Sequence, residues 1–162
     1  MYPLLVFLHV VGVFGFLMAH GASASVAFAL RRERDPERVR ALLMLSATSY
    51  PVMYSSLWLL FILGIVLGFM GSWWGRAWIW TSLILLIAIV VIMSRLGANI
   101  YGEARKLSGL SYMVRGKIQP PSQPASAAEI EAALAQGNPI LLTAIGFGGI
   151  VIIAALMMFK PF

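Results

Sequence analysis

The chain is organised around four long apolar runs, at about residues 3–30, 41–70, 77–96 and 139–159. Each run is near or above the roughly 20 residues that an α-helix needs to cross the hydrocarbon core of a bilayer. With the polar residues that extend them, the predicted helices cover about 3–30, 37–71, 76–100 and 139–159. The pattern predicts an all-α membrane protein, a four-transmembrane-helix bundle that forms one domain over residues 1–162.

Composition agrees with this pattern and excludes several kinds of chemistry. Hydrophobic residues make up 60% of the chain and charged residues 11%, values outside the range of water-soluble domains. The chain has no cysteine, which excludes disulfides, Fe–S clusters and thiolate metal sites. No carboxylate lies within a predicted span, which argues against a proton pump or transporter that relays protons through acidic groups.

The charges predict the orientation of the bundle. With the N-terminus outside, ten basic residues fall on the cytoplasmic face and two on the other, as positive-inside topology requires. The cytoplasmic ten are Arg31, Arg32, Arg34, Arg38, Arg40, Arg95, Arg105, Lys106, Arg115 and Lys117, and the other two are Arg76 and Lys160. We expect a multi-pass protein of the bacterial cytoplasmic (inner) membrane with both termini outside, the lipid bilayer as its partner and no bound nucleic acid.

The first run also invites comparison with a signal peptide, because the small residues of AHGASA resemble a cleavage site. No basic n-region precedes the run, and several apolar residues follow that site, so we expect an uncleaved membrane anchor. The next helix should begin at Asp35, whose carboxylate can cap free amides, with Pro36 at the first helical position. A kink is expected between Thr48 and Pro51, because proline removes a backbone hydrogen bond.

A predicted cytoplasmic linker covers about residues 101–138. Its QPPSQPAS stretch cannot form a helix interior and should be extended. Ser126 and Glu129 have the spacing of a capping box, and Gly137 with Asn138 and Pro139 forms a stop signal. A short surface helix over 127–136 is therefore expected.

Aromatic and small residues suggest how the helices are placed. Four tryptophans near the turn between the second and third helices should form an interfacial aromatic belt: Trp73, Trp74, Trp78 and Trp80. Small residues at four-residue spacing allow close helix contact: Gly15, Ala19, Ser23 and Ala27 in the first helix, Gly64 and Gly68 in the second, Ala144 and Gly148 in the fourth. These contacts could lie within one protomer, in a homo-oligomer or against another membrane protein.

Both histidines of the chain, His9 and His20, lie in the first predicted helix. Ionisable side chains within a membrane span are candidates for function because hydrocarbon penalises them. Their separation of eleven residues is close to three helical turns, so they share a face about 16 Å apart along the axis. The arrangement is similar to that of di-haem membrane cytochromes, in which one helix supplies a ligand to each of two haems, and it suggests haem b as the cofactor.

Two further histidines for bis-histidine ligation are missing from the chain. The sixth ligand could be a methionine, with Met53, Met44 and Met93 as candidates, a residue of a second protomer, or an open position. Arg95 and Asn99, four residues apart, could hold an anionic group such as a haem propionate or a lipid phosphate. Snorkelling of Arg95 to the interface is the alternative.

The alternative for each histidine is a neutral imidazole that hydrogen-bonds a neighbouring helix. In an antiparallel arrangement, Tyr50, Tyr54, Ser55 and Ser56 lie at about the depth of His20, whereas the apolar stretch LLFILGIV lies opposite His9. His9 is therefore harder to explain by hydrogen bonding and is the stronger candidate for a cofactor or metal ligand.

The segments LHVVGVFGFLMAHGASASVAFALRRERDPERVRALL, SYPVMYSSL and GFMGSWWGRAWIW resemble a family of small bacterial integral membrane proteins of unknown function. This resemblance covers most of residues 1–115. More distantly, the leucine-histidine pair that ends at His9 is similar to the start of HemJ-type protoporphyrinogen oxidases and CopD-type copper-resistance proteins. The HemJ-type resemblance implies haem at His9; the later-helix lysine of that type has no clear counterpart here.

Two functions remain open at this point. The first is a membrane-embedded b-type haem protein, an electron carrier or oxidoreductase component, with His9 as the axial ligand, His20 or Met53 as candidates for another ligand, and Arg95 as a candidate partner of a haem propionate. The second is a non-catalytic membrane scaffold or accessory subunit in which the histidines join helices. A metal-ion permease is disfavoured because other polar ligands within the spans are lacking.

Overall fold

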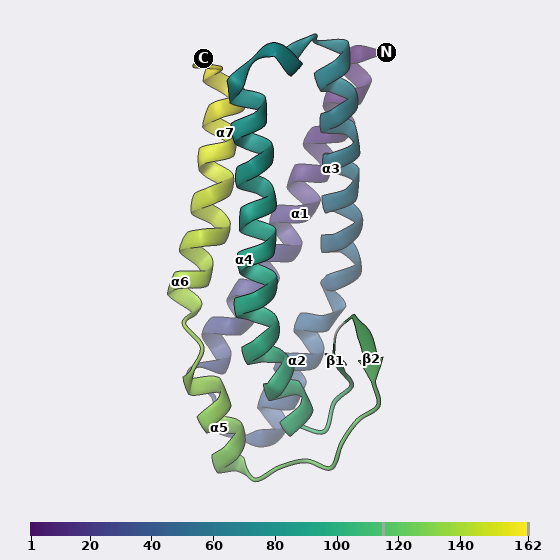
Figure 1. The fold of residues 1–162 in the computed structure, drawn as a ribbon. Coiled ribbons are helices and arrows are strands. Elements are labelled where there is room, and N and C mark those ends of the chain that lie inside the picture. The colour runs from purple at the N-terminus through teal and green to yellow at the C-terminus, as the bar shows by residue number, and fades with distance from the viewer. Residues whose placement is uncertain (115, 162) are drawn as a thin grey trace.

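The computed structural model describes residues 1–114 and 116–161. Four helical segments are long and apolar enough to cross a membrane: Tyr2–Leu30, Pro36–Met70, Ala77–Leu107 and Pro139–Phe159. The all-α, four-helix membrane architecture is therefore confirmed. Both termini lie at one end of the bundle (Figure 1), and the extramembrane segments that follow the third span gather at the other end, which we call the loop end.

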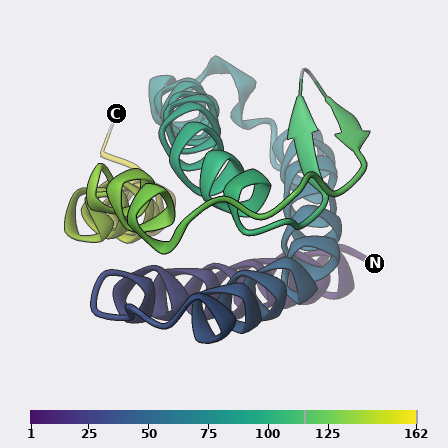
Figure 2. The same ribbon diagram turned by 90° about the horizontal axis from the view of Figure 1, so that it is seen from below.

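The helical elements follow one another in a simple up-and-down order. They are α1 (Tyr2–Leu30), α2 (Pro36–Thr48), α3 (Tyr50–Met70), the 3₁₀ turn η1 (Trp73–Gly75), α4 (Ala77–Leu107), α5 (Ala127–Ala135), α6 (Pro139–Thr143), the π-helical turn η2 (Ala144–Gly148) and α7 (Gly149–Phe159). α1 packs along α3, and α4 packs along α7. Figure 2 shows α4 between α3 and the α6–α7 helix, with α1 running across one side of the bundle. α1 consequently contacts both α3 and α6.

The second span is interrupted where proline was expected to break it. α2 ends at Thr48, and α3 begins at Tyr50 with Pro51 in its first turn. The hydroxyls of Thr48 and Ser49 donate to the carbonyls of Leu45 and Ser46, each at 2.7 Å. Serine and threonine can satisfy carbonyls that a proline leaves free in an apolar surrounding. The interruption predicted between Thr48 and Pro51 is confirmed.

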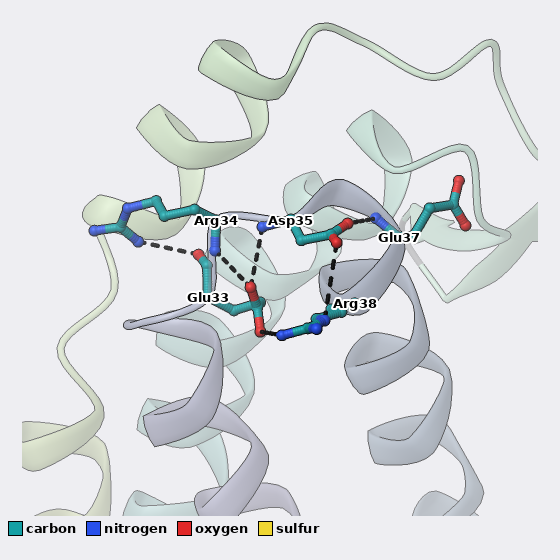
Figure 3. Close-up of polar contacts among 5 residues, drawn as sticks. All are labelled: Glu33, Arg34, Asp35, Glu37 and Arg38. Carbon is teal, nitrogen blue, oxygen red and sulfur yellow. Dashed lines mark hydrogen bonds and ion pairs between the residues drawn. The ribbon is translucent and has the colours of Figure 1, made fainter.

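The turn between α1 and α2 is held by its own charged side chains (Figure 3). The carboxylate of Asp35 accepts a hydrogen bond from the Glu37 amide at 2.9 Å, which confirms the predicted cap. The carboxylate of Glu33 accepts from the amides of Arg34 and Asp35 at 2.9 and 3.0 Å. These two donors, with Arg38 nearby, lower the pKa of Glu33. The turn is thus ordered by local hydrogen bonds at the protein surface.

The loop end contains a packed core of its own. Its buried members come from α1, α2, α4, the segment after α4, and α5: Val26, Leu30, Val39, Leu43, Ala104, Leu110, Ile130 and Leu134. Arg105 strengthens this core, since its Nη1 donates to the Leu43 carbonyl at 2.8 Å and its Nε to the Ser111 carbonyl at 3.0 Å. α4 consequently continues to Leu107, beyond the expected end near residue 100. The predicted end was too early because it followed the end of the apolar run. Beyond residue 100, α4 is amphipathic, and its apolar side is covered by α2 and α5.

A β-hairpin follows α4 where the sequence suggested only linker. β1 (Tyr112–Val114) pairs antiparallel with β2 (Lys117–Gln119), and Met113 lies opposite Ile118. The helix expected over 127–136 is α5. Its Ser126–Glu129 capping box has both hydrogen bonds, from the Ser126 amide to Glu129 at 2.9 Å and from the Glu129 amide to the Ser126 hydroxyl at 3.4 Å.

Candidate functional site around the two membrane histidines

His9 lies in the first half of α1 and packs against a glycine of α3. A Cβ built on Gly64 would be 3.4 Å from Cε1 of His9 and 3.8 Å from its Nδ1. The imidazole is partly exposed, but Nδ1 is buried and makes no hydrogen bond. The backbone of Leu60, one turn before Gly64, lies near the ring. Side-chain types along the sequence do not reveal such a backbone neighbour.

Close contact between α1 and α3 makes this placement possible. A Cβ on Gly12 would meet the Leu60 nitrogen at 3.2 Å, and one on Gly15 would meet the Ser56 hydroxyl at 2.5 Å. Farther along, the hydroxyls of Ser23 and Ser49 share a hydrogen bond of 2.8 Å. Small residues let the two backbones approach and polar hydroxyls join them, as in other membrane helix pairs. The predicted close-contact roles of Gly15, Ser23 and Gly64 agree with this geometry.

His20 occupies a more enclosed position, with 9% of its surface exposed. Its ring stacks on Phe16, with centroids 5.7 Å apart and planes 6° apart, and meets Phe147 of η2 at 5.1 Å and 48°. Nε2 is buried without a hydrogen bond. It faces Gly146, where an added Cβ would overlap it. This complementary contact between His20 and Gly146 joins α1 to the fourth span.

The hydrogen-bonding neighbours expected for His20 lie elsewhere, and this expectation is corrected. Ser56 contacts Gly15, the Ser55 hydroxyl donates to Val52, and Tyr54 is 54% exposed. The expectation assumed that the shared histidine face meets one helix along its whole length. Because α1 runs across the bundle (Figure 1), the same face meets α3 at His9 and η2 at His20.

The π-helical turn explains a second correction in the fourth span. Ala144 and Gly148 were expected to form the close helix contact, yet nothing lies within 4 Å of a Cβ built on Gly148. The contacts are made by Gly146, against His20, and by Gly149, against Ile89 of α4. A π-turn inserts an extra residue and rotates the following residues onto another face. A fixed four-residue spacing cannot account for that rotation.

The other predicted ligands are not brought to His9. Met53 lies in the same helix as Gly64 but three turns away along the axis, about 16 Å. Gly68 of α3 contacts Ile79 of α4, and Arg95 is exposed about 24 Å farther along α4 than Ile79. Met44 is 53% exposed. In the described residues, no group of three or more histidine, aspartate or glutamate side chains could hold a metal ion.

The tryptophans form a packed cluster that closes the end of the bundle near both termini. Trp78 is only 3% exposed, whereas Trp80 is 49% exposed and donates from Nε1 to the Trp74 carbonyl at 2.9 Å. The Lys160 ammonium lies 4.4 Å from the ring centre of Trp73 and 5.7 Å from that of Trp78. These cation–π contacts tie the end of the chain to the cluster. The belt expected from sequence is thus in part a buried cap.

The two histidines differ in their fit to haem. At His20 the unpaired nitrogen faces helix backbone between two phenylalanine rings, so a macrocycle does not fit there without movement of η2. At His9 one nitrogen is buried against α3 and the ring is partly exposed. The surroundings of His20 therefore do not fit the di-haem arrangement, and His9 is the histidine that is left partly accessible.

Comparison with known proteins gives no further assignment. No family model, no curated protein and no solved structure matches this chain.

Proposed function

We propose that this chain is a membrane-embedded b-type haem protein, an electron carrier or a component of a membrane oxidoreductase, with His9 as the axial ligand. The observation that carries the proposal is the environment of His9: Nδ1 is buried against Gly64 of α3 without a hydrogen bond, while the ring remains partly exposed. In a haem-ligating histidine the ring nitrogen that does not bind the iron is commonly held by the surrounding protein, which fixes the orientation of the ring. A bound haem would supply reversible one-electron chemistry at its iron.

The proposal includes a location and an orientation. The strong excess of basic residues at the loop end supports placement of that end in the cytoplasm and of both termini outside. We place the protein in a bacterial cytoplasmic membrane on the same grounds. The His9 site then lies in the half of the bundle that is nearer to the outer surface.

A second function is favoured by a different observation. Each histidine packs against a glycine of another helix, His9 against Gly64 and His20 against Gly146. Such paired contacts would also suit a non-catalytic scaffold or accessory subunit, in which the imidazoles fix how α1 packs against its neighbours. In that case neither histidine binds a cofactor.

An absorption spectrum of the detergent-purified protein, expressed with ample haem supply, separates the two functions. The haem proposal expects a Soret band that His9→Ala abolishes and that His20→Ala, the matched control in the same helix, retains. Size-exclusion elution and far-UV circular dichroism of both variants establish that loss of the band is not loss of the fold. A colourless wild-type protein overturns the haem proposal, and a band that survives His9→Ala overturns the assignment of the ligand.

A further inference from the structure

The β-hairpin at the loop end exposes large apolar side chains. Met113, Val114 and Ile118 are 63%, 45% and 75% exposed, and Met113 and Ile118 form a cross-strand pair. A two-stranded hairpin has marginal stability by itself in water. Exposed apolar residues concentrated on so small an element indicate a surface that is covered by something else.

The hairpin is placed next to the membrane-spanning part of the molecule. Figure 1 shows β1 and β2 beside the lower part of the bundle, at the loop end. β1 packs against α4, and Arg105 of α4 holds the segment before β1 through the Ser111 carbonyl at 3.0 Å. The hairpin is thus held against the last part of α4, the third of the four helices that are long and apolar enough to cross a membrane.

Charged and polar side chains accompany this apolar surface. An open groove of about 300 Å³ runs beside the contact between β1 and α4, and Asn99, Glu103 and Lys106 of α4 line it, with the Lys106 ammonium 3.1 Å from the Glu103 carboxylate. Arg95 precedes Asn99 by about one helical turn, so both side chains lie on the same side of α4. Lys117 is the cross-strand neighbour of Val114. Cationic groups beside exposed apolar residues are the combination that binds a surface of anionic phospholipids.

We propose that the hairpin docks onto the bilayer that the helices span. Met113 and Ile118, on one face of the hairpin, enter the boundary between headgroups and acyl chains, and Lys117, which shares the other face with Val114, contacts the phosphates of anionic phospholipids. This docking holds the long connection between the third and fourth spans against the membrane. It depends neither on haem nor on which side of the membrane the loop end occupies.

The absence of native cysteine makes a site-specific test direct. Ile118→Cys in the full chain is labelled with an environment-sensitive fluorophore and reconstituted into phosphatidylcholine vesicles with and without phosphatidylglycerol. Ala132→Cys, at an exposed position of α5, is the matched control. We expect a blue-shifted emission at position 118 that is quenched by nitroxide-labelled lipid and protected from iodide, and the opposite behaviour at position 132.

Three outcomes would overturn the proposal in whole or in part. Iodide quenching at position 118 equal to that at position 132 places the hairpin in water. A blue shift without nitroxide quenching, which varies with the protein-to-lipid ratio, assigns the hairpin to a protein contact. For the charge component, Lys117→Gln should reduce nitroxide quenching at position 118 in vesicles that contain phosphatidylglycerol and leave it unchanged in pure phosphatidylcholine. An unchanged quenching in the vesicles that contain phosphatidylglycerol overturns the role of Lys117.

Discussion

The contact between His20 and Gly146 can be tested by adding a single methyl group. In Gly146→Ala the new Cβ would overlap Nε2 of His20, whose ring is already confined between Phe16 and Phe147. The ring cannot yield without losing these aromatic contacts. Overpacking of a filled site costs about 1–3 kcal/mol, so we expect Gly146→Ala to lower the folding equilibrium constant roughly 5- to 150-fold.

Gly148→Ala is a matched control in the same π-turn, because nothing lies within 4 Å of its added Cβ. Alanine is favoured over glycine in helices by up to about 1 kcal/mol, so this variant should be neutral or slightly stabilised. This gain is common to both variants, so they should differ by the overpacking cost alone, about 1–3 kcal/mol. Reversible unfolding in mixed micelles with increasing SDS, followed by far-UV circular dichroism, measures this difference.

A third variant tests whether the imidazole is the cause. His20→Ala opens the space that the added methyl group needs, so Gly146→Ala should cost little in that background. The reasoning is refuted if Gly146→Ala and Gly148→Ala have the same stability. It is equally refuted if Gly146→Ala costs as much without His20 as with it.

Three further predictions concern the remaining contacts. A double-mutant cycle of Ser23→Ala and Ser49→Ala should give a coupling of about 0.6–1.7 kcal/mol for their 2.8 Å hydrogen bond, and a coupling of zero would show that the bond does not join α1 to α3. The pKa of Glu33 in the folded protein lies below its ordinary value of 4.5. The ionised carboxylate therefore stabilises the folded protein above pH 4.5, and this stabilisation is lost as the pH falls through the lower folded-state pKa. Glu33→Gln should reduce this loss of stability at acid pH in unfolding titrations. Arg105→Gln should destabilise the protein by about 1–3 kcal/mol, because it removes the charged hydrogen bonds that the guanidinium donates to the carbonyls of Leu43 and Ser111. Glu131→Gln, which removes an ion pair with both side chains more than half exposed, should change stability by less than about 1 kcal/mol. A reversed order of the two effects would contradict the assigned role of Arg105.

Features governed by local rules were predictable from the sequence. The spans follow from run length, the break before Tyr50 follows from Pro51, and the caps at Asp35 and Ser126 follow from side-chain chemistry within one turn. These features depend on neighbours only a few residues away. A single sequence therefore contains the information that determines them.

Features that depend on how helices are rotated against each other were not predictable in this way. The π-turn changes which glycine of the fourth span meets α1, and no local signal distinguished Gly146 from Gly148. The extension of α4 to Leu107 depends on burial of Ala104 and its neighbours by α5 and α2. One local signal was overlooked: Gly109, with φ of +67°, is the left-handed residue that commonly terminates a helix, and it marks the end of α4 directly.

The path of α1 across the bundle links these observations to the proposed function. Periodicity places His9 and His20 on one face of a helix and does not by itself distinguish them. Because that face meets α3 at one depth and η2 at another, the two imidazoles acquire different surroundings: His20 is enclosed by Phe16, Phe147 and Gly146, while His9 keeps part of its ring exposed. An enclosed imidazole positions helices and an accessible one can receive a ligand. If haem binds, the same geometry requires it to depend on His9 and to tolerate the loss of His20, which is the asymmetry that the two alanine variants measure.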